Sequence, residues 1–184
     1  VTLTISASPV TVEINPDNSE REQCKENPIQ TLDANNSVIN IPAGYTVKWY
    51  DADNNVVLNP ILSEVGSRTY YAVLRDNLTG CESLDRAPVT LTILDSEILV
   101  IDDSLKTQTF CNNTSTPTVA QLQPSGANIR WYANPTGGTA LNDTDALTDA
   151  TRYYAVLVSP NGCESAERTE VLVNLACESD LAVT

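Results

Sequence analysis

The segments that decide the fold are Trp49-Tyr50, Tyr70-Tyr71-Ala72-Val73-Leu74 and Gly80-Cys81-Glu82-Ser83. All three return later in the chain, as Trp131-Tyr132, Tyr153-Tyr154-Ala155-Val156-Leu157 and Gly162-Cys163-Glu164-Ser165. In both copies the tryptophan precedes the cysteine by 32 residues (49 to 81 and 131 to 163). A shared spacing of this length predicts two copies of one folded unit.

Strand patterns dominate both copies. Apolar and polar residues alternate around each tryptophan and again through Val89–Ile93, which is the period of a half-buried strand. Turn formers such as Asp51–Asn55 separate these strands. The pattern predicts an all-β chain of two tandem immunoglobulin-like β-sandwich domains. The residues expected in the two cores are Trp49, Tyr71, Trp131 and Tyr154.

The copies set the expected domain boundaries. We assign residues 1–94 to the first domain, 95–176 to the second and 177–184 to the start of a following domain. Residues 1–5 are identical to residues 89–93, which close the first copy, so they are either the last strand of a preceding repeat or an edge strand of the first domain. We expect the chain to be part of a longer polypeptide.

The five cysteines suggest structural disulfides. One pair per repeat gives Cys24–Cys81 and Cys111–Cys163, with Cys177 left over. Such bonds indicate an oxidising compartment, hence an exported protein. Zinc is the rival interpretation, but the chain has no histidine and no Cys-x-x-Cys pair.

Charge and hydropathy exclude two kinds of partner. A net charge of −14 argues against nucleic acid, because that binding rests on neutralising phosphates. The sequence has no apolar run long enough to span a bilayer, so we expect no membrane insertion.

A family resemblance rests on Trp-Tyr, Pro135–Leu141, Tyr-Tyr-Ala-Val and Asn161–Ser165. In these segments the chain resembles the bacterial Ig-like repeats of Bacteroidetes surface proteins, which occur in large adhesin-like polypeptides, many exported by the type IX secretion system. The resemblance covers residues 6–175, and the first copy departs from it at Asp51–Asn55. It implies a spacer or adhesive module without catalytic residues. The final stretch, 177–184, resembles the opening of another extracellular repeat family, which would place Cys177 in a neighbouring domain.

Enzymatic activity is not expected. Without histidine, neither a Ser-His-Asp nor a Cys-His arrangement can form. A carboxylate pair remains open from composition, but no acid pair outside the Cys-Glu-Ser segments recurs at a matched position.

Two acidic loops are candidate calcium sites, because calcium prefers several oxygen ligands. Their acids are Asp51, Asp53, Asp143 and Asp145. The first loop is not an EF-hand, since Val56 and Leu62 stand where that loop needs glycine and glutamate. Ordinary turns also favour Asp and Asn. We therefore expect no cofactor, with calcium as the alternative.

Several exposed-face residues recur between the copies. The pairs are Lys48 and Arg130, Tyr50 and Tyr132, and Arg86 and Arg168. The tyrosines either cover a half-buried sheet face or form a sugar platform beside a cation. The arginines are expected to pair with Glu82 and Glu164. Asp103-Ser104-Leu105 resembles the O-glycosylation motif of Bacteroidetes exported proteins, which makes Ser104 a candidate modification site.

These observations predict a non-catalytic stalk or spacer in a large cell-surface, adhesin-like protein. Its expected partners are neighbouring repeats of the same polypeptide. The alternative is an adhesive module that binds a carbohydrate or a cell-surface protein. Loop sequences diverge between the copies while the matched positions persist, which favours the spacer.

Overall fold

The computed structural model describes residues 11–17, 21–113 and 115–177. It falls into two compact units, the first ending at Asp95 and the second beginning at Ser96. The predictions for residues 1–5 and 178–184 lie outside the described residues.

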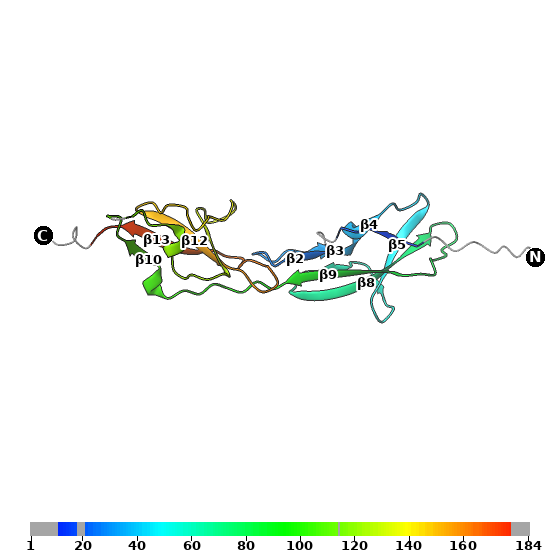
Figure 1. Cartoon of the computed structure of the whole chain (residues 1–184). Coiled ribbons are helices and arrows are strands. Elements are labelled where there is room, and N and C mark those ends of the chain that lie inside the picture. The colour runs from blue at the N-terminus through cyan, green and yellow to red at the C-terminus, as the bar shows by residue number, and fades with distance from the viewer. Residues whose placement is uncertain (1–10, 18–20, 114, 178–184) are drawn as a thin grey trace, which may run out of the picture. The chain divides into compact units, whose positions relative to one another are not determined.

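The main sheet of the first unit has five strands in the order β2-β9-β8-β5-β6 (Figure 1). Their bounds are β2 Glu22–Cys24, β5 Tyr45–Tyr50, β6 Val56–Val57, β8 Gly66–Asp76 and β9 Ala87–Leu94. β2 pairs with β9 in parallel, and the other neighbours are antiparallel. Short elements supply the rest of this unit: β1 Glu13–Ile14 with β4 Val38–Ile39, β3 Leu32–Asp33 with β7 Ile61–Leu62, and the 3₁₀-helix η1 Ala34–Ser37.

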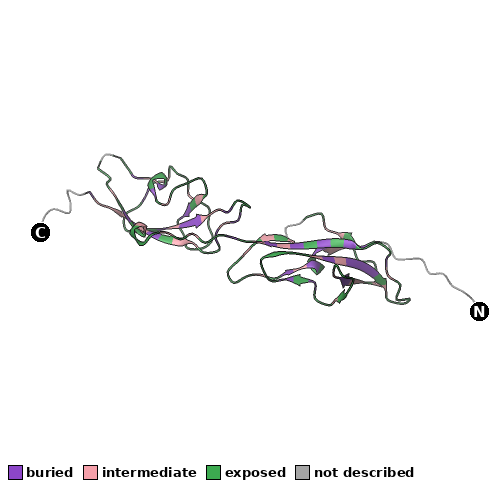
Figure 2. Cartoon of the chain, turned by 90° about the horizontal axis from the view of Figure 1, so that it is seen from below, coloured by how far each residue is buried: buried purple, intermediate pink, exposed green. Residues whose placement is uncertain are grey.

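The first core lies between the main sheet and these short elements. Along β9, Val89, Leu91 and Ile93 are buried while the residues between them face outward, which Figure 2 shows as alternating colours. Each such side chain contributes about 1.5–3 kcal/mol by leaving water. Across the core, Leu32 and Leu62 of the β3–β7 pair belong to the same buried cluster. Two facing layers packed through alternating side chains make a β-sandwich.

The second unit repeats this strand order in a four-stranded sheet, β10-β13-β12-β11. Its strands are β10 Thr107–Phe110, β11 Ile129–Tyr132, β12 Thr151–Leu157 and β13 Thr169–Leu175. β10 pairs with β13 in parallel, as β2 does with β9. The facing layer is shorter here and contains the 3₁₀-helix η3 Val119–Gln121 and a single bridge between Thr118 and Ala146. A further 3₁₀-helix, η2 Asp103–Leu105, precedes β10. Val119, Leu122, Trp131, Leu147, Tyr153, Ala155, Val171 and Val173 form the buried cluster.

The core tyrosine is the first of each Tyr-Tyr pair, so the prediction of Tyr71 and Tyr154 is wrong. Trp49 lies opposite Ala72 in the β5–β8 ladder, and opposite residues share a face of the sheet. Tyr70 therefore lies on the tryptophan side and Tyr71 on the other side. The corresponding residues of the second unit are Trp131, Ala155 and Tyr153. Tyr70 and Tyr153 are 4% and 5% exposed, whereas their neighbours are half-buried.

Within the described part of the chain, no helix is long and apolar enough to cross a bilayer.

Candidate functional site

The Cys-Glu-Ser segments form a matching corner after β8 and after β12. Ser83 Oγ accepts a hydrogen bond from the Leu74 amide at 3.2 Å and donates to the Asp85 carbonyl at 3.0 Å. Ser165 Oγ accepts from the Leu157 amide at 3.3 Å and donates to the carbonyl two residues on at 2.9 Å. Both serines are buried, so the bonds satisfy hydroxyl groups that water does not reach. The corner brings the preceding glutamate back over the sheet.

In the first unit that glutamate holds a tyrosine and a lysine. Tyr50 Oη donates to Glu82 Oε2 at 2.6 Å, and Lys48 Nζ lies 2.7 Å from Glu82 Oε1. Lys48 and Tyr50 are on the same face of β5, because they are two residues apart. Lys48 Nζ also lies 4.9 Å from the centre of the Tyr50 ring. One carboxylate therefore accepts two strong, charge-assisted bonds from a single strand.

The second unit builds the same cluster with arginine in place of lysine. Tyr132 Oη donates to both oxygens of Glu164, at 2.7 and 2.9 Å. Arg130 Nη1 lies 2.8 Å from Glu164 Oε1. We call each set of tyrosine, glutamate and strand cation the tyrosine cluster of its unit. The recurring positions 48, 50 and 82, matched by 130, 132 and 164, are a signal that sequence reasoning had available but did not connect.

A second arginine covers each tyrosine ring. Arg86 Cζ lies 4.2 Å from the centre of the Tyr50 ring, and Arg168 Cζ lies 3.5 Å from that of Tyr132. These are cation–π distances. Glu164 forms its ion pair with Arg130, so the prediction that Arg168 would be its partner is wrong. The guanidinium of Arg168 instead lies over the Tyr132 ring.

The covering arginine also anchors the loop that follows the Trp-Tyr strand. Arg168 Nη1 donates to the carbonyl of Asn134 at 2.6 Å and to that of Gly137 at 2.8 Å. Arg86 Nη1 donates to the side-chain oxygen of Asn54. The two loops differ in sequence, yet both are tied to the same position of the repeat.

The contacts within the clusters keep three titratable groups in their ordinary protonation states at neutral pH. The hydrogen bond from Lys48, and after it the one from Tyr50, lowers the pKa of Glu82 from its ordinary 4.5. The bond to Glu82 raises the pKa of Lys48 from 10.5. Burial, and then the bond to Glu164, raises the pKa of Tyr132 from 10.0. Each shift moves its group away from neutral pH, so none of the three is poised for general acid–base chemistry.

The tyrosines do not form an open sugar platform. Tyr50 and Tyr132 are only 7% and 6% exposed, because the sheet lies on one side of each ring and an arginine on the other. Of the two interpretations of these residues, the structure supports the covered sheet face.

The acidic loops use their carboxylates to shape turns. Asp51 Oδ1 accepts from the amides of Asp53 and Asn55 at 2.9 and 2.8 Å, and Oδ2 accepts from the Asn55 side chain at 3.0 Å. These bonds, led by the one from the Asn55 side chain, lower the pKa of Asp51. In the other loop Asp145 accepts from the Asn142 amide at 2.8 Å, while Asp143 lines a pocket described below. The described residues contain no group of three acids, cysteines or histidines placed to hold a metal ion.

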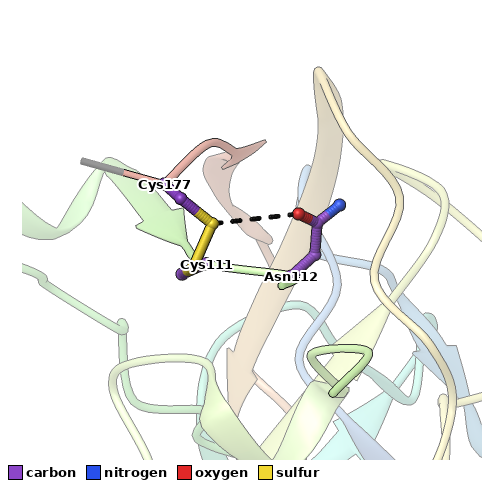
Figure 3. The surroundings of a disulfide bond; sticks show 3 residues. All are labelled: Cys111, Asn112 and Cys177. Carbon is purple, nitrogen blue, oxygen red and sulfur yellow. Dashed lines mark hydrogen bonds between the residues drawn. A yellow bond between two sulfur atoms is a disulfide. The ribbon is translucent and has the colours of Figure 1, made fainter. Parts of the chain in front are cut away.

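The second unit is closed by a disulfide between Cys111 and Cys177, whose Cα atoms are 4.5 Å apart (Figure 3). Asn112 Oδ1 lies 4.0 Å from Cys177 Sγ. The predicted Cys111–Cys163 pair is therefore wrong, and so is the assignment of Cys177 to a neighbouring domain. The parallel strands β10 and β13 end side by side at Phe110 and Leu175, which brings the next cysteines together.

Cys163 cannot take that place because it precedes β13, whereas Cys111 follows the far end of that strand. A seven-residue strand spans about 23 Å, and bridged Cα atoms lie within about 7 Å. The same geometry separates Cys81, before β9, from Cys24, beside its last residue Leu94. Cys81 is an exposed free thiol, so the predicted Cys24–Cys81 pair is also wrong.

Ser104, the candidate modification site, is exposed in η2. The Asp102 side chain accepts a hydrogen bond from the Ser104 amide at 2.9 Å and caps this helix.

A surface pocket of about 230 Å³ lies beside the second tryptophan. It is lined by Val119, Ala120, Leu122, Ser125, Gly126, Ala127, Ile129, Trp131 and Asp143. Sequence reasoning placed Trp131 in the core and Asp143 in a calcium loop. It had no signal that the two residues border one cavity.

Comparison with known proteins adds a family for part of the chain. Residues 102–176 match the family described as "Ig-like domain CHU_C associated". The match confirms the resemblance to bacterial Ig-like repeats for this segment. No curated protein matches the chain in sequence.

Among solved structures, the chain is similar to the mixed-linkage glucan utilization locus protein SGBP-B of Bacteroides ovatus, in complex with a mixed-linkage heptasaccharide. The identity is 10% and the TM-score 0.28, over 95% of this chain and 49% of that one. The chain thus spans about half the length of that protein. At this TM-score the likeness carries no information about function.

Proposed function

We propose that the chain is a non-catalytic spacer of two tandem Ig-like domains within a larger extracellular protein. The observation that carries this proposal is the duplicated tyrosine cluster. In both units each polar or charged side-chain group of the cluster is bonded to another residue of the same unit. The cluster is therefore a structural contact without a free reactive group. A spacer needs such contacts in each copy, whereas its loops are free to differ.

The family match begins at residue 102 and so covers only the second unit. For the first unit the proposal rests on its likeness to the second. Its sheet has the strand order of the second unit, with the same parallel strand at one edge. Its Cys-Glu-Ser corner, tyrosine cluster and covering arginine all recur. These features support an Ig-like domain in the first unit as well.

Export is supported by the Cys111–Cys177 bond, because structural disulfides form and persist in oxidising compartments. The net charge of −14 suits an exposed, soluble surface. The partners we expect are neighbouring repeats of the same polypeptide at the cell surface.

The spacer proposal is tested by a domain exchange, carried out in the cell that makes the protein. Residues 11–177 are replaced in the full-length protein by an unrelated pair of Ig-like domains. Surface display, measured by a protease-accessible tag, and the adhesion of the cells should both be retained. If display is retained but adhesion is lost, the segment also binds a partner and is not a spacer alone. If display itself is lost with a folded replacement pair, the spacer proposal fails.

A further inference from the structure

The two tryptophans differ in what their indole nitrogens meet. Trp49 Nε1 donates a hydrogen bond of 2.8 Å to Asn35 Oδ1, and Asn35 lies in η1. Among the residues that the structure describes, Trp131 Nε1 has no acceptor. Trp131 is nonetheless only 6% exposed, so its N–H group is unpaired in a side chain that is more than nine-tenths buried. The indole N–H of a mostly buried tryptophan usually has a hydrogen-bond partner, which marks this position as one to explain.

Trp49 has an acceptor and Trp131 has none because one position of the repeat differs between the units. Both η1 and η3 follow an extended N-cap residue, Asp33 in the first unit and Thr118 in the second. The next residue in each case donates its amide to the facing segment: Ala34 to the Pro60 carbonyl at 2.9 Å, and Val119 to the Asp145 carbonyl at 3.0 Å. The residue after that is Asn35 in one unit and Ala120 in the other.

Alanine therefore stands where the first unit has the acceptor for its tryptophan. Ala120 and Trp131 both line the 230 Å³ pocket, so the position without an acceptor borders this space. Trp131 Nε1 is not one of the fully enclosed unpaired atoms of the described residues, which are Arg21 Nε and Ser37 Oγ. The unpaired N–H is thus not fully enclosed, and its side chain lines the pocket.

The lining restricts what the pocket can take. Val119, Leu122 and Ile129 line it together with the indole, and polar groups contribute the larger part of its surface. Asp143 on the rim is exposed, and its carboxylate accepts no hydrogen bond from any described residue. A ligand must therefore offer an acceptor to the N–H and donors to the carboxylate. No cationic side chain lines the pocket, so an anion would meet Asp143 without compensation.

A neutral polyol with an apolar face meets all of these conditions, and a sugar ring is such a molecule. A pocket of 230 Å³ is many times the roughly 10–15 Å³ of cavity space that one water molecule needs, which gives room for a single ring. We propose that this pocket binds one saccharide unit of a glycan, with Trp131 Nε1 donating to a sugar oxygen and Asp143 accepting from sugar hydroxyls. The inference goes beyond the spacer role and does not depend on it.

The chain has two tryptophans, so its two indole N–H resonances give a direct test. The isotope-labelled chain is titrated separately with the methyl glycosides of glucose, galactose, mannose and N-acetylglucosamine. At least one glycoside should shift the Trp131 indole resonance in the millimolar range. The Trp49 resonance should stay in place, because its N–H is already bonded to Asn35.

Two variants separate this site from a general surface effect. Ala120→Asn restores the acceptor of the first unit, so the Trp131 resonance should move toward that of Trp49 and the glycoside response should disappear. Asp143→Asn keeps the size of the rim but removes its charge, and should weaken binding about tenfold. Folding of both variants is checked on the remaining amide resonances.

Two results would overturn the inference. One is a Trp131 resonance that none of the four glycosides shifts, which would mean that the pocket holds only water. The other is an equal response in folded Ala120→Asn, which would place the sugar elsewhere.

Discussion

Glu82 and Tyr50 are 32 residues apart in the sequence, yet the carboxylate and the phenol meet at 2.6 Å on the outer face of the first sheet. Glu164 and Tyr132 repeat the contact over the same interval at 2.7 Å. The contact ties the corner after one strand to its neighbour, so a local sequence motif reinforces a long-range pairing. Its energy is small beside that of the core, and it adds to the backbone ladders that already pair these strands.

Removal of the phenol oxygen should weaken the second unit. We expect Tyr132→Phe to lower its free energy of unfolding by about 1–2 kcal/mol, because Glu164 loses a charge-assisted bond at a nearly buried site. Denaturant unfolding followed by the Trp131 indole resonance measures the loss.

The matched control is Tyr154→Phe, since Tyr154 is half-buried and no described residue bonds to its hydroxyl. Equal losses in the two variants would contradict the role of the cluster.

The first cluster should make stability depend on pH at both extremes. Because the pKa of Glu82 is lowered in the folded state, its contribution to folding stability is present above the ordinary pKa of 4.5. This contribution is lost as the pH falls through the lowered pKa. Because the pKa of Lys48 is raised, its contribution is complete below 10.5 and is lost as the pH rises through the raised value.

Thermal unfolding of the chain and of Glu82→Gln across this range checks the prediction. Other carboxylates, such as Asp51 and Asp76, also have lowered pKa values, so they add to the loss of folding stability at acid pH. The relevant quantity is therefore the difference between the two proteins, which should shrink toward acid pH. A difference that is constant with pH would count against the ion pair.

The disulfide should account for a large part of the stability of the second unit. Cys111 and Cys177 are 66 residues apart, and closing a loop of that length stabilises the folded state by about 4 kcal/mol in the chain-entropy model. Replacing both cysteines by serine should cost about that amount in denaturant unfolding.

Cys81→Ser is the control and should be neutral, because that thiol is exposed and free. Non-reducing peptide mapping gives an independent check. It should recover a Cys111–Cys177 peptide and a Cys81 that alkylates without reduction. Recovery of Cys111 joined to Cys163 would refute this connectivity.

The covering arginine should order the loop beneath it. In Arg168→Lys the charge remains, but the guanidinium contact with the Tyr132 ring and the two bonds to the Asn134 and Gly137 carbonyls are lost. Amide hydrogen exchange within residues 133–138 should then become faster. Arg152→Lys is the control, because Arg152 forms an exposed pair with Glu170 whose replacement changes little.

The all-β character of the chain was predictable, because the alternation of apolar and polar side chains along a strand depends on local sequence. Val171, Val173 and Leu175 alternate with polar or half-buried neighbours, and β13 forms there. The choice between Tyr70 and Tyr71 depends on the strand register, since a shift of one residue exchanges the faces. That register is set by the Trp49–Ala72 pair across the ladder, which no local pattern reveals.

Disulfide pairing failed for a related reason. The repeat suggested which cysteines were equivalent, but bonding depends on which strand ends lie together. Only the parallel pairing of β10 with β13 brings Cys111 to Cys177. The pocket could not be foreseen either, because the effect of Ala120 is visible only when η3 is compared with η1 in space.

The position of the Cys111–Cys177 bond determines how the second unit would respond to a pull along the chain. Strands β11, β12 and β13 all lie between the two cysteines in the sequence. Tension that enters before Cys111 and leaves after Cys177 passes through the two sulfur atoms and bypasses the 66-residue loop. Strands β11, β12 and β13 are thereby relieved of the pull, whereas β10, which precedes Cys111, stays on the loaded path.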